Sequence, residues 1–209
     1  FQYSPLEEKL NAGTHFIGVF FALYALICLS VKAAPLGALA VFCYVVFGFS
    51  LVAIFVCSSL YHLEKLEKRK LFMKKLDHMA IFILIAGSLT PFLLVNLSNE
   101  KSLWFSFFIW AFALGGILFK LFGKAERRKL SLFFYLSMGW SALFIWPDLK
   151  EALPPLSMQY ILYGGLSYSV GVIFYVMKKV PHHHMVWHLF VMGGTYFHYL
   201  AVKVAHPIQ

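Results

Sequence analysis

The sequence predicts an all-α, polytopic membrane protein built as a bundle of seven transmembrane helices. The first observation is composition: 61% of the 209 residues are hydrophobic and 13% are charged. Soluble domains contain about 45–50% apolar and about 25% charged residues. A chain this apolar has too little polar surface to cover a core in water, which excludes a water-soluble enzyme. The second observation is a series of long apolar segments joined by short polar connections.

Seven apolar segments follow one another along the chain. A helix needs about 17–25 apolar residues to cross the hydrocarbon, and most segments reach that length, although the fifth is short and the second long. The segments are apolar at odd and even positions alike, which excludes the alternating strands of a barrel and favours helices. We expect one domain over residues 1–209, with spans at 16–31, 36–62, 76–97, 102–119, 130–146, 156–177 and 185–204.

The Lys and Arg residues predict the orientation of the bundle. Of the 18, fourteen fall beside one set of segment ends and four beside the other. The positive-inside rule then predicts a cytoplasmic N-terminus and a C-terminus outside. The net charge of +9 is therefore a topology signal and predicts no nucleic-acid partner. The fourteen are Lys9, Lys65, Lys68, Arg69, Lys70, Lys74, Lys75, Lys120, Lys124, Arg127, Arg128, Lys129, Lys178 and Lys179; the four are Lys32, Lys101, Lys150 and Lys203.

Small residues within the segments indicate close packing rather than chemistry. Glycine pairs let helix backbones approach in a membrane. Free cysteines in apolar runs, without a CxxC motif, behave as small apolar residues. The glycine pairs are Gly115 and Gly116, Gly164 and Gly165, and Gly193 and Gly194; the cysteines are Cys28, Cys43 and Cys57.

Polar and ionisable residues gather at the expected cytoplasmic ends of the segments. Such groups are costly at membrane depth, which makes them candidates for function. The predicted topology brings the end of the second segment to the same level as the starts of the first, third and seventh. The residues at this level are Asn11, His15, Ser58, His62, Asp77, His184 and His188.

The histidines among them have the spacing of metal ligands. His184 and His188 are four residues apart, so a helix presents both on one face, and His62 supplies a third nitrogen. Zinc with three protein ligands keeps a fourth position open for catalysis, although imidazole also suits iron, nickel and copper. Asp77 would lie beside the site as a general base, and Ser58 could hold Asp77 or a substrate carbonyl.

Other features at this level have structural alternatives. A single HxxxH pair is a weak signal by itself. Asp77 could instead cap the third helix, and Ser58 could bond its own helix backbone. We expect Pro181 to be the first residue of the seventh helix, where its missing N–H costs nothing.

The remaining histidines are expected to have other roles. We expect His182 and His183 to be solvated loop residues and His78 to be packed or interfacial. His198 lies about three turns beyond His188, which predicts a separate polar contact deeper in the bundle. His206 belongs to the C-terminal tail.

Three motifs in order resemble the progestin and adipoQ receptor family, in particular its bacterial haemolysin III branch. The resemblance covers nearly the whole chain. The first motif is Asn11-x3-His15 after Glu7 and Glu8; the second is Ser58-x3-His62 followed by Asp77; the third is His184-x3-His188 followed by His198. Two further stretches look like that branch, one running from Asp77 through Pro91 and the other from Trp187 to Phe190.

The resemblance implies a fold, a metal and a reaction class. It implies seven helices with a cytoplasmic N-terminus. It implies zinc bound by His62, His184 and His188, with Asp77 near the attacking water and Ser58 beside it. Asn11, His15 and His198 would surround the site. The family belongs to a wider group of membrane hydrolases that includes alkaline ceramidases.

We therefore expect a zinc-dependent hydrolase of a lipid amide or ester, located as a multi-pass protein in the cell membrane. One alternative is a non-enzymatic receptor or sensor in which zinc joins helices, favoured by four protein ligands and no cavity. Another is a membrane-perturbing cytolytic protein, although the chain lacks an amphipathic soluble-to-membrane segment. A transporter is disfavoured because no pair of spans carries matching Gly/Pro breaks.

Overall fold

The computed structural model describes residues 3–123 and 128–205, and all its regular elements are helices. Lys124, Arg127 and His206 lie outside these ranges. The elements are α1 (Pro5–Ala33), η1 (Ala34–Leu36), α2 (Ala38–Leu63), α3 (Glu67–Pro91), η2 (Phe92–Leu97), α4 (Glu100–Phe122), α5 (Arg128–Trp140), η3 (Ser141–Ile145), α6 (Trp146–Ala152), α7 (Pro155–Val176) and α8 (His183–Val204).

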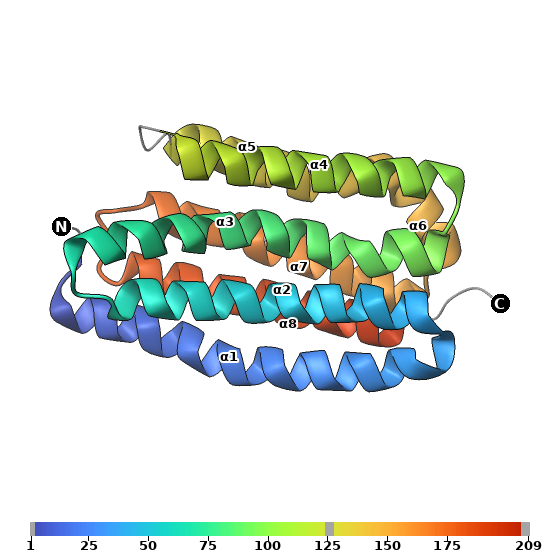
Figure 1. Ribbon diagram of the computed structural model, residues 1–209, viewed down its shortest axis with the longest axis horizontal. Coiled ribbons are helices and arrows are strands. Elements are labelled where there is room, and N and C mark those ends of the chain that lie inside the picture. Colours follow the sequence, from blue (N-terminus) through green and yellow to red (C-terminus); the bar gives the residue numbers. More distant parts are fainter. Residues whose placement is uncertain (1–2, 124–127, 206–209) are drawn as a thin grey trace.

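The helices lie side by side along the long axis of the molecule (Figure 1). Helix α2 packs against α1 and α3, and α8 packs against α7 and α1. Helices α4 and α5 form the edge farthest from α1 in this view. Consecutive long helices run in opposite directions, so the end of α2, the start of α3 and the start of α8 lie at the same end of the bundle.

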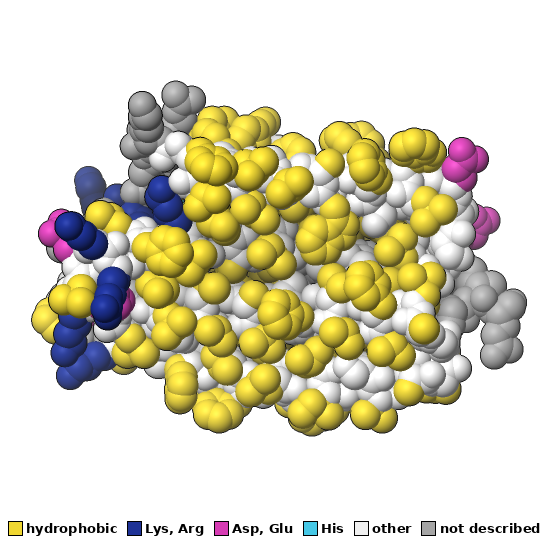
Figure 2. All heavy atoms as spheres, viewed as in Figure 1, with side chains coloured by type: hydrophobic (Ala, Val, Ile, Leu, Met, Phe, Trp, Pro, Cys, Tyr) yellow, Lys and Arg dark blue, Asp and Glu magenta, His cyan; other side chains and the backbone are white. Residues whose placement is uncertain are grey.

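The flanks of the bundle are apolar and exposed. Phe20, Phe49, Phe107 and Phe144 each expose more than 60% of their surface. Figure 2 shows such side chains covering the visible flank, while Lys and Arg gather at the end that holds the N-terminus in Figure 1. A soluble protein rarely exposes apolar surface on this scale, whereas lipid covers it without cost.

Five helical segments of the described chain are long and apolar enough to cross a membrane. They are Pro5–Leu36, Ala38–Leu63, Glu67–Leu97, Glu100–Phe122 and Arg128–Ala152. Helices α7 and α8 are not among them. The expectation of an all-α bundle of apolar helices is confirmed.

Helix α1 begins well before the predicted span at 16. Ser4 and Glu7 form a capping box: the Glu7 N–H donates to Oγ of Ser4 at 3.2 Å, and the Ser4 N–H donates to Oε2 of Glu7 at 2.9 Å. Pro5 follows as a residue preorganised for the first turn. Hydropathy marks the part of a helix that contacts lipid, so it missed this polar first turn.

Helix α3 also begins early, at Glu67 rather than near 76. The cations from Lys68 to Lys75 therefore lie on its first turns and not in a loop, since Lys and Glu are good helix formers. Asp77 lies inside the helix, so the alternative in which it caps the N-terminus is wrong. The same extension places Asp77 about three turns from the start of α3, and one turn after Lys74.

Prolines shape the ends of the third and fifth segments. Pro91 donates no backbone hydrogen bond, and the helix continues beyond it as the π-helix η2. Pro147 likewise cannot donate to the carbonyl of Leu143, and the chain there forms the 3₁₀ segment η3 before α6. The fifth segment thus extends to Ala152, beyond the predicted end at 146, which removes its apparent shortness.

The start of the last helix differs from the prediction. Helix α8 begins at His183, after His182 in the left-handed conformation with φ of 55°. Pro181 lies in the turn before it and is not its first residue. This turn places His184 and His188 in the first two turns of α8.

Glycine allows close approach at one member of each pair. A Cβ built on Gly116 would lie 2.3 Å from Cζ of the buried Phe82 ring of α3, whereas one on Gly115 would meet nothing within 4 Å. A Cβ on Gly164 would lie 2.0 Å from Cδ2 of His198, so α7 packs directly on α8 at this point.

Adjacent glycines of α4 offer a matched test of this packing. Gly116→Ala should destabilise the protein by about 1–3 kcal/mol, because the buried Phe82 ring must move. Gly115→Ala should leave stability unchanged or raise it slightly, since alanine favours helix. The measurement is the unfolding temperature of each purified variant in detergent. Equal temperatures for the two variants would contradict the packing described here.

Candidate metal centre

Three buried histidines from two helices meet at the basic end of the bundle. His62 lies in the last turn of α2, and His184 and His188 lie on one face of α8. One ring nitrogen from each lies within 4.8 Å of the others. The ring centroids are 5.1 Å apart for His62 and His184, 5.1 Å for His62 and His188, and 4.6 Å for His184 and His188. Packing of α2 near α8 thus brings together histidines that are over a hundred residues apart.

His62 is held by a carboxylate that the sequence analysis did not assign to the site. Its Nδ1 lies 2.6 Å from Oε2 of Glu8 in the first turns of α1, and Oε1 of Glu8 accepts a hydrogen bond from Lys70 of α3 at 2.8 Å. A proton on Nδ1 leaves Nε2 of His62 as an acceptor. That Nε2 is buried and has no hydrogen-bond partner among the described residues. Carboxylates commonly orient metal-binding histidines in this way.

His188 is oriented by α1 in a similar way. Its Nδ1 lies 3.0 Å from the backbone carbonyl oxygen of Asn11 and 3.2 Å from Oγ1 of Thr14. Asn11 therefore contacts the site through its backbone carbonyl oxygen rather than its side chain. Thr14 was not expected from the sequence. Donation from Nδ1 to the carbonyl leaves Nε2 of His188 available to a metal.

Two aromatic rings enclose the cluster. His15 stacks on His188 with centroids 3.6 Å apart, and neither of its ring nitrogens has a hydrogen-bond partner in the described chain. Tyr3, which precedes α1, stacks on His184 with ring centroids 5.0 Å apart. Burial raises the pKa of the Tyr3 hydroxyl far above its usual range, so this ring is a neutral cover.

Asp77 lies beside the cluster without belonging to it. The group of ligand atoms within 4.8 Å contains the three histidines and not Asp77. Its Oδ2 is 3.3 Å from Nδ1 of His78, and that nitrogen also lies 2.8 Å from the Lys74 carbonyl oxygen. His78 is thus packed within α3, as the sequence analysis expected.

Ser58 lies one turn before His62 on α2 and is buried. Its hydroxyl has no hydrogen-bond partner among the described residues, so the alternative in which it bonds its own helix does not hold. A buried hydroxyl without a partner, one turn from His62, can donate a hydrogen bond to a bound molecule.

The other histidines have separate environments. His182 exposes 43% of its side chain, in keeping with a solvated loop residue. His183 does not: it is buried, and its Nδ1 lies 3.0 Å from the carbonyl oxygen of Phe174. His198 lies away from the cluster, packed on Gly164 and beside Tyr168 of α7.

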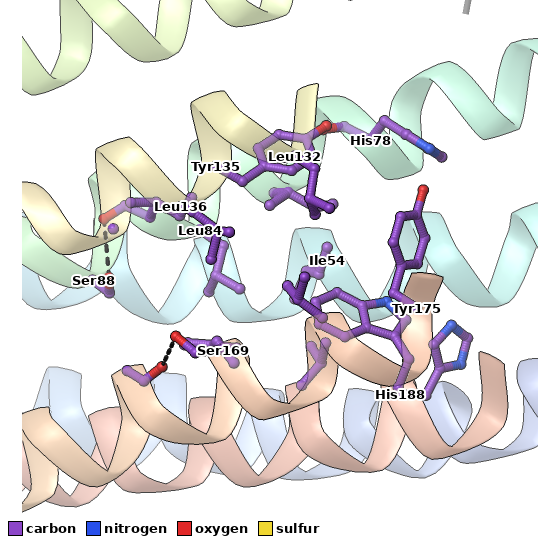
Figure 3. A pocket seen from close by; sticks show the side chains of 18 of the residues that line it. Ile54, His78, Leu84, Ser88, Leu132, Tyr135, Leu136, Ser169, Tyr175 and His188 are labelled. Carbon is purple, nitrogen blue, oxygen red and sulfur yellow. Dashed lines mark hydrogen bonds between the residues drawn. The ribbon is translucent and has the colours of Figure 1, made fainter. Parts of the chain in front are cut away.

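A cavity of about 400 Å³ runs from the cluster into the bundle. Figure 3 shows Tyr175, His78 and His188 toward one end and Ser88 and Ser169 toward the other. Apolar side chains of α2, α3 and α5 line the cavity between these two ends, including Ile54, Leu84, Leu132 and Leu136. His15, Asp77, His184 and His198 also line it, whereas Ser58 does not.

The residues present fit a divalent metal such as zinc. Buried polar atoms without partners are rare in native proteins and call for an explanation. Here Nε2 of His62 and Nδ1 of His184 are both buried and unpaired, within reach of the same point. Imidazole nitrogens oriented by a carboxylate and a carbonyl are a donor set that zinc favours.

Comparison with known proteins agrees with these motifs. The chain matches the family model described as "Haemolysin-III related" over residues 3–199. The chain belongs to this family. It is 40% identical over 190 residues to the hemolysin-3 homolog of Bacillus subtilis, covering 90% of the chain and 89% of that protein. Hemolysin-3 of Bacillus cereus is also 40% identical over 190 residues, covering 90% of the chain and 87% of that protein.

A more distant relative extends the comparison beyond bacteria. The human monocyte to macrophage differentiation factor is 29% identical over 163 residues, covering 75% of the chain and 67% of that protein. The resemblance to the progestin and adipoQ receptor family and its haemolysin III branch is confirmed. Its apolar helices and its membership of the haemolysin III family together identify the chain as a multi-pass protein of the cell membrane.

Glu8, Thr14 and Tyr3 contact the histidines but were not expected from the sequence, and only Glu8 left a signal there. Glu8, Asn11 and His15 are spaced i, i+3 and i+7, which places them on one face of α1. That polar stripe is visible in the sequence. Thr14 and Tyr3 left none, because only the packing of α1 on α8 gives them a role.

The link between Glu8 and His62 predicts a measurable effect on metal binding. Glu8→Gln should weaken zinc binding about 10–100-fold, because the amide orients His62 less strongly and lowers its basicity. Competition with a chromophoric chelator measures this affinity. Glu7→Gln is the matched control, since Glu7 contacts Ser4 and His182 but none of the three histidines of the cluster. Equal affinities in the two variants would refute the assigned role of Glu8.

Proposed function

We propose that this chain crosses the membrane seven times and hydrolyses an ester or amide of a membrane lipid at a zinc ion held by His62, His184 and His188. The observation that carries the proposal is the histidine cluster at one end of an apolar cavity that Asp77 also lines. A hydrolase needs this combination of a metal site, a base and room for an acyl chain. The zinc identity, the roles of the residues and the topology are parts of the proposal.

The topology rests on length and charge. Helices α7 and α8 each have 22 residues, about 33 Å at 1.5 Å per residue, which is enough to cross a hydrocarbon layer of about 30 Å. Lys and Arg gather at one end (Figure 2). The positive-inside rule assigns that end, with the N-terminus and the cluster, to the cytoplasm, and the C-terminus to the outside.

The number of ligands favours catalysis over a purely structural zinc. When bound, zinc supplies a Lewis acid that polarises a carbonyl and makes a water molecule more acidic. A closed structural site uses four protein ligands, whereas the described residues offer three histidines at this point. The adjoining cavity also argues against the receptor alternative.

Asp77 would handle the proton. Its carboxylate takes a proton from the water that attacks the acyl carbon, and gives it to the departing alcohol or amine. A bond forms between the water oxygen and the acyl carbon, the ester C–O or amide C–N bond breaks, and a fatty acid and an alcohol or amine result. The reaction needs no further reactant.

Other residues would position the reactants. The Ser58 hydroxyl, which has no hydrogen-bond partner among the described residues, would donate to the substrate carbonyl or to Asp77. His15 holds the ring of His188 by stacking on it. The apolar walls of the cavity exclude water and accept the acyl chain, which stabilises substrate in the bundle.

Two substitutions separate catalysis from metal binding. Asp77→Asn should lower turnover at least about 100-fold while zinc content is unchanged, since Asp77 is not a ligand. His62→Ala should lose both. The measurements are release of labelled fatty acid from ceramide and phospholipids in proteoliposomes, and zinc per chain by elemental analysis. Glu151→Gln, an exposed carboxylate at the opposite end, is the control with full activity. If His62→Ala keeps both zinc and turnover, the proposal fails.

The cytolytic alternative takes its support from the printed name of the Bacillus cereus relative. Leakage of a dye from lipid vesicles distinguishes it. If leakage follows from lipid hydrolysis, Asp77→Asn should abolish it. Leakage at the wild-type rate with Asp77→Asn would instead indicate direct membrane perturbation.

The orientation has its own test. A membrane-impermeant maleimide added to intact cells should label Lys150→Cys and not Lys68→Cys, because Lys68 lies at the cytoplasmic end in the proposed topology. Both positions are exposed in the structure. Labelling of Lys68→Cys alone would show that the orientation is the reverse of the proposed one. In permeabilised cells the reagent should label both variants.

A further inference from the structure

The mouth of the cavity carries three cations from three different segments. Lys74 comes from α3, Arg128 from the start of α5 and Lys178 from the connection after α7. All three line the cavity together with His184 and His188 of the cluster. Among the described residues that line it, Asp77 is the one carboxylate. The mouth therefore has a net positive charge, while the interior is apolar.

Arg128 and Lys74 lie close to the proposed reaction centre. The Arg128 guanidinium is 4.4 Å above the Tyr175 ring and donates to the Tyr175 carbonyl oxygen. The Tyr175 ring is in turn 6.1 Å from that of His184. One aromatic ring thus separates Arg128 from the metal ligands. On the other side, Lys74 lies one turn before Asp77 on α3.

Topology alone does not explain this placement. The positive-inside rule asks only for cations at the cytoplasmic end, and exposed residues such as Lys68, Lys129 and Lys179 already satisfy it. None of these three lines the cavity. Cations that border a low-dielectric cavity attract an anion much more strongly than cations in water.

From this arrangement we infer that the substrate of the proposed hydrolase is an anionic lipid whose phosphate is held by Lys74, Arg128 and Lys178. Arginine and lysine are the usual phosphate ligands, and a phosphate at the mouth leaves the acyl chain to enter the apolar cavity. An ester bond near the headgroup then lies between the phosphate and the chain, beside the histidines and Asp77. This inference rests on the proposed function and adds the class of substrate.

The test compares a lipid that carries a phosphate with one that lacks it, in one lipid background. Proteoliposomes of constant composition carry a trace of acyl-labelled phosphatidylglycerol or of acyl-labelled diacylglycerol, so surface charge is the same in both arms. Wild type should hydrolyse the phosphatidylglycerol about tenfold faster, as expected for one well-placed charged hydrogen bond. Equal rates would overturn the inference.

Adjacent lysines provide the matched control. Lys178→Gln should reduce the preference by slowing hydrolysis of the anionic lipid alone, whereas Lys179→Gln should leave both rates unchanged, because Lys179 does not line the cavity. Arg128→Gln should reduce the preference further. Lys178 is exposed, so its substitution does not threaten folding. A preference that survives both Lys178→Gln and Arg128→Gln overturns the inference.

Binding separates this inference from the proposed function. Asp77→Asn should bind fluorescent phosphatidylglycerol more tightly than fluorescent diacylglycerol, which has no phosphate, and addition of Arg128→Gln should remove the difference. If wild type hydrolyses no lipid yet binds with this preference, the hydrolase fails and the anionic-lipid site stands. If wild type hydrolyses both lipids at equal rates, the anionic-lipid site fails and the hydrolase stands. Soluble glycerol phosphate should not displace the lipid; if it does at micromolar concentration, the site takes a soluble phosphate ester and the lipid assignment fails.

Discussion

The Glu8 carboxylate is the contact on which the histidine cluster depends. It lies in the first turn of α1 and contacts both His62 of α2 and Lys70 of α3. These three helices thereby have a common register at the basic end. Because Glu8 orients the His62 ring, the position of Nε2 relative to His184 and His188 follows from this contact.

Such a group of charges is stable inside a membrane protein only if each member has a partner. The side chains of Glu8, Lys70 and His62 are 15%, 11% and 0% exposed. A charge buried to that extent without a partner would cost several kcal/mol, while a paired and hydrogen-bonded one costs far less. Among the described residues, neither ring nitrogen of His15 nor Nδ1 of His184 has a hydrogen-bond partner, which marks the cluster as the place where a bound ion would complete the polar contacts.

The residues of the cluster could be predicted because topology is a strong constraint. Antiparallel helices bring the end of α2 and the starts of α3 and α8 to one end of the bundle, and His62, Asp77, His184 and His188 all lie there. The same reasoning could not find Glu8 or Lys70, since both lie in helical turns that extend beyond the hydrocarbon. It also misplaced the start of α3, because hydropathy reports contact with lipid and is silent on where backbone hydrogen bonding begins.

The sequence by itself determined the all-α membrane fold, the asymmetry of charge between the two ends and the set of histidines that can share a metal. These follow from composition and periodicity, which act locally along the chain. Only the tertiary structure decided that Asn11 acts through its carbonyl oxygen, that His183 is buried, and that Lys74, Arg128 and Lys178 border one cavity while Lys179 does not. Those facts depend on the rotation of each helix about its axis, which packing between distant segments sets and no local pattern encodes.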